Sequence, residues 1–203
     1  MYDQYDQYLH AYEKLSLGTA GVIMGLVLLL LHGFALLNPE ATKNALRQAA
    51  THTQAAKILL IIDFVWIFLL LLDADWNPLQ MNLFDFNKAR DFLLILCPVV
   101  CGVLLYYNRK RELLFPRALG LFLLLMALVP LTAAFLKDPV TRLLIPCWWY
   151  PVLTLAMYWV AKPYEFRNQM EKLTAHPILY RVINGIGAAW GAAILVCAVV
   201  FWY

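Results

Sequence analysis

Two titratable side chains stand inside long apolar stretches of this 203-residue chain, and they are the first candidates for chemistry. His32 lies about five residues from the end of one apolar stretch, and Asp63 lies about six residues into the next. Because a helix rises 1.5 Å per residue, both side chains would lie roughly 8–9 Å inside a bilayer, near the same face. We therefore expect them to meet. A His–Asp pair could relay protons, hold a substrate, or satisfy two polar groups between neighbouring helices.

No complete catalytic or cofactor motif accompanies this pair. The chain has neither a His-Glu-x-x-His zinc motif nor a Gly-x-Ser-x-Gly nucleophile elbow. One histidine and one carboxylate leave a metal site short of ligands, and a haem held by two histidines needs a second one at similar depth. The sequence therefore predicts no metal and no cofactor, and it favours a protein that is not an enzyme.

The elements that would position these residues are membrane-spanning helices. Of all residues 63% are hydrophobic and 14% are charged, and the mean hydropathy of +0.67 excludes a water-soluble domain. About 20 apolar residues suffice for a helix to cross a bilayer. The sequence predicts one transmembrane domain over 1–203, an all-α polytopic bundle of six helices preceded by a tail over 1–16. The expected spans lie near 17–37, 57–73, 92–107, 113–136, 143–161 and 181–202.

Basic residues predict how the bundle is oriented. The loops after the first, third and fifth spans hold eleven of the sixteen lysines and arginines, and most acids lie on the opposite side. Because loops rich in Lys and Arg stay in the cytoplasm, both termini are expected outside, with a bacterial inner membrane as the expected location. The eleven residues are Lys43, Arg47, Lys57, Arg109, Lys110, Arg111, Arg117, Lys162, Arg167, Lys172 and Arg181.

An internal repeat is indicated when the chain is shifted on itself by 124 positions. The first loop and second span then align with the fifth loop and sixth span, so an axis along the membrane normal would relate the two hairpins. Each loop would hold a short amphipathic helix at the inner interface, within an arrangement of three two-helix hairpins. The alternative is chance, because many offsets can be tried. The aligned residues are Pro39 with Pro163, Asn44 with Asn168, His52 with His176, and Trp66 with Trp190.

The basic loops predict contact with membrane lipids that carry anionic headgroups. Nucleic acid is not expected, because no nucleic-acid-binding module surrounds these residues. The two loop histidines occupy equivalent positions in the repeat, and they could bind a headgroup or a partner, or cap the interfacial helices. The candidates for lipid or partner contacts are His52, His176, Arg47, Arg167 and Lys172.

Aromatic and small residues predict how the helices pack. Trp66 and Trp190 would lie about 13.5 Å into the bilayer, so we expect them to be buried, as core residues or against a quinone, pigment or lipid chain. Four glycines form small-x-x-x-small patterns, which allow close approach of two helix backbones. Such contacts could form within one chain, or between copies in a homo-oligomer or larger membrane complex. These glycines are Gly21, Gly25, Gly187 and Gly191.

Three functions remain open on this basis. The first is a non-enzymatic accessory, scaffold or lipid-associated protein, which the scarcity of intramembrane charge favours. The second is a small transporter or channel with a polar site at His32 and Asp63. The third is a membrane-embedded enzyme acting on lipid, in which the same two residues serve as acid and base. A continuous polar cavity reaching Asp63 would favour the second and third functions, and a filled bundle would favour the first.

Overall fold

The computed structural model describes residues 15–49, 51–72, 77, 79, 89–107 and 113–203. In these ranges the chain forms eight α-helices and one short 3-10 helix with no strand, which confirms the all-α fold. Most of the predicted tail and the cations at 109–111 lie outside the described residues. The helices are α1 (Leu17–Leu37), α2 (Pro39–Ala49), α3 (Thr53–Leu71), α4 (Arg90–Tyr107), α5 (Leu114–Ala134), η3 (Val140–Leu143), α6 (Leu144–Ala161), α7 (Pro163–Ala175) and α8 (Pro177–Phe201).

Local residues set several of the helix starts. The Ser16 side chain accepts a hydrogen bond from the backbone N–H of Thr19, 3.0 Å away, and so caps α1. Helices α2, α7 and α8 each begin at a proline. Proline suits the first helical position because its φ is already helical and it carries no N–H to leave unsatisfied there. The chain can therefore turn sharply between a spanning helix and an interfacial one.

Two of the predicted boundaries were placed too late in the sequence. Helices α3 and α8 begin at Thr53 and Pro177, one turn before the predicted starts at 57 and 181. The predicted spans started at Lys57 and Arg181, because a cation was expected to mark the edge of the hydrocarbon. Long basic side chains can instead reach toward water from within a continuing helix.

The described residues contain five helices that are long and apolar enough to cross a membrane. Their lengths run from 19 to 25 residues, which matches the roughly 20 residues that a bilayer requires. The predicted span over 92–107 corresponds to α4, which is not one of the five. The chain is thus an apolar helical bundle of membrane type. The five are Leu17–Leu37, Thr53–Leu71, Leu114–Ala134, Val140–Ala161 and Pro177–Phe201.

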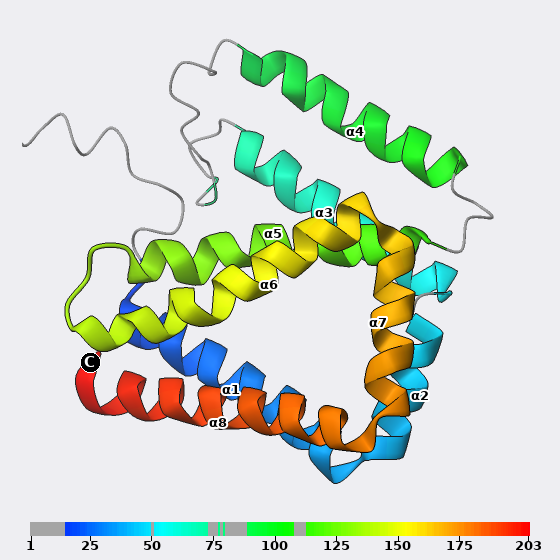
Figure 1. Cartoon of the computed structure of the whole chain (residues 1–203). Coiled ribbons are helices and arrows are strands. Elements are labelled where there is room, and N and C mark those ends of the chain that lie inside the picture. The colour runs from blue at the N-terminus through cyan, green and yellow to red at the C-terminus, as the bar shows by residue number, and fades with distance from the viewer. Residues whose placement is uncertain (1–14, 50, 73–76, 78, 80–88, 108–112) are drawn as a thin grey trace, which may run out of the picture.

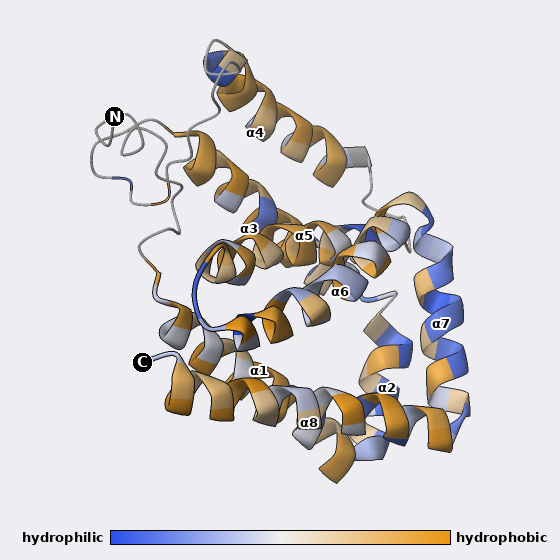
Figure 2. Ribbon diagram, turned by 60° about the vertical axis from the view of Figure 1, so that its left-hand side comes forward, coloured by the Kyte–Doolittle hydropathy of each residue, from blue (hydrophilic) through white to orange (hydrophobic). Residues whose placement is uncertain are grey.

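The long helices pack in pairs, and two short helices lie across one end of them (Figure 1). Helix α1 packs most extensively against α8, so the first and last helices of the described chain are neighbours. Helix α5 packs against both α6 and α3, and α3 also contacts α4. Helices α2 and α7 touch each other at the end where α1 stops and α8 starts. Figure 2 shows that the long helices are mainly hydrophobic, whereas α7 is largely hydrophilic.

Two apolar clusters fill the bundle. The larger one joins α1, α5, α6 and α8 and includes the fully buried Ile145 and Ile194. The smaller one joins α3 to α5 through Ala56, Leu60 and Ala118, with side chains of α4 against it. Many large apolar side chains on the long helices are exposed outside these clusters, as expected for surfaces that meet lipid tails.

Candidate functional site

His32 on α1 is held by side chains from α8 and α6. Its Nδ1 lies 3.0 Å from Oδ1 of the buried Asn184, and the Asn184 amide nitrogen donates to the Tyr180 carbonyl oxygen at 2.8 Å. Since Oδ1 can only accept, Nδ1 of His32 donates in this pair. The imidazole also meets the Trp148 ring edge-on, with centroids 5.7 Å apart. A three-helix polar and aromatic cluster therefore surrounds His32.

Gly187 on α8 makes room for the imidazole. A Cβ atom built at Gly187 would lie only 2.4 Å from Cδ2 of His32, so no other residue fits without moving the ring. One face of the His32 ring is thus covered by the α8 backbone. Asn184 bonds to Nδ1, so the half-buried imidazole lies in the α1–α8 interface.

Asp63 on α3 is fully buried, and neither of its carboxylate oxygens has a hydrogen-bond partner. Its spacing of three residues from Leu60 and seven from Ala56 places it on the helix face that packs against α5. An ionised carboxylate without a partner at such a depth costs at least ~2.5 kcal/mol on insertion scales. Asp63 is therefore the one buried acid of the described chain that packing alone does not explain.

The predicted hydrogen-bonded pair of His32 and Asp63 was wrong. The imidazole bonds to Asn184, and the carboxylate oxygens have no partner. Equal depth brings two side chains together only when their helices pack on the corresponding faces. Here α1 packs on α8, whereas α3 packs on α5 and α4. The sequence analysis missed Asn184, although an amide just inside a predicted span was a visible signal.

The two deep tryptophans contact different neighbours. The Trp190 indole N–H donates to the Leu144 carbonyl oxygen at 3.0 Å, and its ring lies 6.4 Å from that of Trp148. The Trp66 ring meets Phe122 of α5 edge-on, with centroids 6.1 Å apart. Both rings thus take part in helix packing, although each is half-buried and not fully buried as expected.

The four predicted packing glycines lie in one interface within the chain, between α1 and α8. A Cβ at Gly25 would lie 2.9 Å from the carbonyl oxygen of Gly191, and a Cβ at Gly191 would lie 2.8 Å from the Leu29 nitrogen. A Cβ at Gly21 would overlap the Trp202 ring. Close approach of the two backbones requires glycine here, because any side chain would occupy the space of main-chain atoms.

Helices α2 and α7 are joined by a hydrogen bond between residues far apart in the sequence. Nε of Arg47 donates to Oγ1 of Thr174 at 3.0 Å, and Nη2 approaches the Thr174 carbonyl oxygen at 3.5 Å. Nearby, the Lys43 ammonium pairs with Glu40 at 3.1 Å and lies 5.4 Å from the centre of the Tyr180 ring. Helix α2 is therefore fixed to both α7 and α8.

Aromatic side chains dock α7 onto the long helices. The buried Phe166 ring meets Trp159 of α6 edge-on at 5.0 Å and Phe115 of α5 at 6.0 Å. The Trp159 indole N–H donates to Oε1 of Gln169 at 2.8 Å. Phe166, which the sequence analysis did not single out, is thus the main apolar anchor of this helix.

The remaining predicted lipid contacts are exposed at this end of the bundle. Arg167, Lys172 and His176 are open to the surroundings, and Arg167 lies 3.6 Å from Glu171 in an exposed pair that contributes little stability. Nδ1 of His52 accepts the Ala55 backbone N–H at 3.2 Å and so caps α3. Of the two readings offered for His52, the structure supports the cap.

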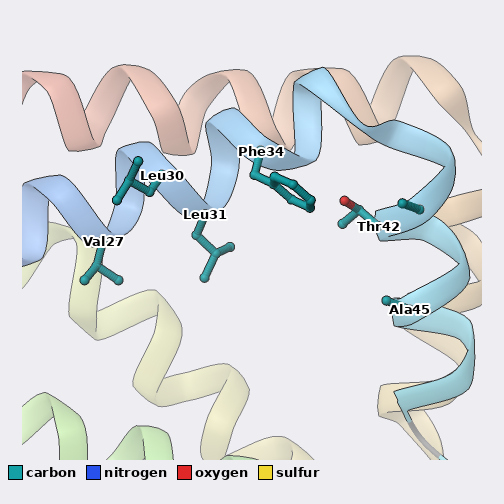
Figure 3. A pocket seen from close by; sticks show the side chains of 7 residues that line it. Val27, Leu30, Leu31, Phe34, Thr42 and Ala45 are labelled. Atoms are coloured by element: carbon teal, nitrogen blue, oxygen red, sulfur yellow. The ribbon is translucent and has the colours of Figure 1, made fainter.

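An open apolar groove lies in the corner between α1 and α2, with a volume of about 710 Å³ (Figure 3). No lining side chain is charged, and the only lining hydroxyl, that of Thr42, donates to the Asn38 carbonyl oxygen at 3.0 Å. The groove therefore suits an apolar chain. Its lining residues are Val27, Leu30, Leu31, Phe34, Ala41, Thr42 and Ala45.

Comparisons of the chain with models of protein families, with curated proteins and with solved structures found no match.

Proposed function

We propose that the chain spans the membrane six times, with both termini on one side and α2 and α7 on the other. Gly18 at the start of α1 lies beside Tyr203 at the end of the chain, which supports termini on the same side. Helices α3 and α5 both start near α7 and run in the same direction (Figure 1), so the chain returns between them. Helix α4 lies in that returning segment and provides the sixth crossing.

The distribution of cations supports a cytoplasmic position for α2 and α7. Loops rich in Lys and Arg remain in the cytoplasm, and Asp or Glu contribute little to this rule. At the opposite end, the described basic residues are Arg90, Lys137 and Arg142. The described residues at the α2 and α7 end are Lys43, Arg47, Lys57, Arg117, Lys162, Arg167, Lys172 and Arg181.

Single cysteines at Lys137 and Arg167 test this topology in a variant without native cysteines. Both positions are exposed, and they lie at opposite ends of the bundle. A membrane-impermeant thiol reagent added outside intact cells should label the Lys137→Cys variant, and the Arg167→Cys variant should label only after the membrane is opened. Labelling of both variants from the same side would contradict the topology.

The internal repeat belongs to the same proposal. Asn38 and Lys162, at the two junctions into interfacial helices, have nearly equal backbone angles, with φ of −124° and −128° and ψ of 63° and 74°. Helix α5 packs against both α3 and α6, so the close pairing of α1 with α8 has no counterpart between α3 and α6. The similarity between the two halves thus lies in the path of the backbone and not in how the helices pack. The matching ends at the 124-residue offset are Leu37 and Ala161, Pro39 and Pro163, and Thr53 and Pro177.

We propose that the protein is a non-enzymatic, lipid-associated membrane component that binds anionic phospholipid from the cytoplasmic leaflet. The observation that carries this proposal is the apolar groove between α1 and α2, because α2 also carries the exposed Arg47 in its last turn. An acyl chain would occupy the groove while the phosphate meets Arg47. Each cation near a membrane surface contributes about 1 kcal/mol toward anionic lipid. The packed surroundings of His32 give less support to a transporter or an enzyme that uses this residue.

Replacing Arg47 tests this function against a control that keeps the charge. Arg47→Gln removes the cation, whereas Thr174→Ala removes the hydrogen bond between α2 and α7 but leaves Arg47 in place. The protein would be purified from nanodiscs of equal phosphatidylglycerol and phosphatidylcholine, and the retained lipids would be counted by native mass spectrometry. We expect Arg47→Gln to lower the preference for phosphatidylglycerol about fivefold, and Thr174→Ala to leave it unchanged. Equal losses in both variants, or no preference in the unaltered protein, would refute the proposal.

A further inference from the structure

Asp63 lies near the middle of a spanning helix and lacks any partner for its charge. It is the eleventh of the nineteen residues of α3, it is fully buried, and both carboxylate oxygens are without hydrogen bonds. Acidic residues inside membrane helices are rare, and they mark ion or proton pathways more often than packing sites. The carboxylate must therefore be neutralised by something that binds it.

Neighbouring side chains do not supply that neutralising group. Lys57 precedes Asp63 by six residues and so lies on another face of α3. From α4, the Cys97 thiol donates to the Phe64 carbonyl oxygen at 3.6 Å, and Cys101 follows one turn later. Arg117 of α5 is exposed, at the α2 and α7 end of its helix. No described cation therefore faces the carboxylate.

A metal ion does not fit the site either. Ca²⁺ takes six to eight oxygen ligands, and Mg²⁺ requires an octahedral set. The described part of the chain gathers no three His, Cys, Asp or Glu side chains at one point. A proton needs no further ligand, because it binds a single carboxylate oxygen covalently.

We propose that Asp63 is a proton-binding site between α3, α4 and α5. The carboxylic acid carries its proton while the bundle is packed around it, and the O–H bond breaks when water reaches the site, which transfers the proton to water as hydronium. Helix α4 packs next to the site, where its Cys97 thiol donates to the carbonyl oxygen of Phe64, the residue after Asp63. This site is independent of the lipid groove, which lies between α1 and α2.

Labelling with dicyclohexylcarbodiimide tests whether Asp63 holds a proton. This apolar reagent reacts with protonated carboxyl groups: the acid adds across a C=N bond to give an O-acylisourea, which rearranges to a stable N-acylurea. Peptide mass spectrometry should find the adduct on Asp63 at least tenfold more often than on the exposed Asp91. An unlabelled Asp63, or protection of Asp63 by sodium ions, would overturn the proposal, the latter because it would identify a metal-cation site.

Infrared spectroscopy tests whether the proton exchanges. The unaltered protein should have a carboxylic C=O band that is absent from Asp63→Asn and retained in Asp91→Asn. Transfer of the native protein to D₂O should shift this band as the proton is replaced by deuterium. A missing band would refute the protonated acid, and a band that never shifts would refute exchange with water. Asparagine matches the shape of a neutral aspartic acid, so the variant is expected to fold.

Discussion

Leucine in place of Gly25 is expected to separate α1 from α8 and to lower the free energy of unfolding by about 3 kcal/mol, at the upper end of usual overpacking costs. A Cβ at this position would lie 2.9 Å from the carbonyl oxygen of Gly191 and 2.9 Å from the Leu195 nitrogen. Both are backbone atoms of α8, which cannot rotate away as a side chain could. The loss can be measured by reversible unfolding in mixed micelles.

Gly33 provides the matched control in the same helix. A Cβ built at Gly33 meets no atom within 4 Å, so Gly33→Leu should change the free energy of unfolding by less than about 0.5 kcal/mol. Similar losses at Gly25 and Gly33 would mean that contact with α8 does not determine the effect, since leucine forms helix better than glycine at both positions. Such a result would contradict the close α1–α8 interface.

Helix limits could be predicted because they depend on nearby residues. The first helix was expected over 17–37 and occupies Leu17–Leu37, where Ser16 caps one end and Pro39 begins the next helix at the other. The interfacial helices were predictable for the same reason, since a proline begins each of them and polar and apolar residues alternate with helical period. Such signals act within one or two turns of the chain.

The partners of each helix face could not be predicted in the same way. The depth of a residue in the bilayer follows from counting residues along its helix. Which residue its side chain contacts also depends on which helix packs against that face. The partner of His32 is Asn184, 152 residues away, and no local pattern connects them. The glycine spacing on α1 and α8 predicted close helix contacts, but it did not indicate that these two helices meet each other.

The proposed repeat pairs two positions whose surroundings differ. The 124-residue offset aligns Asp63 with Gly187, and the structure gives these two positions opposite roles. Gly187 leaves space for the imidazole of His32, whereas the equivalent position on α3 holds Asp63, whose carboxylate has no hydrogen-bond partner. The expectation of a histidine beside the acid rested on the equal depth of His32 and Asp63, and the imidazole lies beside Gly187 instead.

A double-mutant cycle between His32 and Asn184 gives the second large expected effect. His32→Leu and Asn184→Leu each leave the other polar group unsatisfied in a packed interface, which costs about 1–3 kcal/mol per substitution. Replacing both together removes the unsatisfied groups as well, so the double variant should lose about 1–2 kcal/mol less than the sum. The cycle is measured from the free energies of unfolding, in mixed micelles, of the unaltered protein, the two single variants and the double variant.

The same cycle between His32 and Asp63 is the control that separates packing from depth. Their helices pack on different neighbours, so His32→Leu and Asp63→Asn should be additive within about 0.5 kcal/mol. If the coupling with Asp63 exceeded the coupling with Asn184, the two residues would share one site, as their equal depth first indicated. Such a result would contradict the separate packing of α1 on α8 and of α3 on α5.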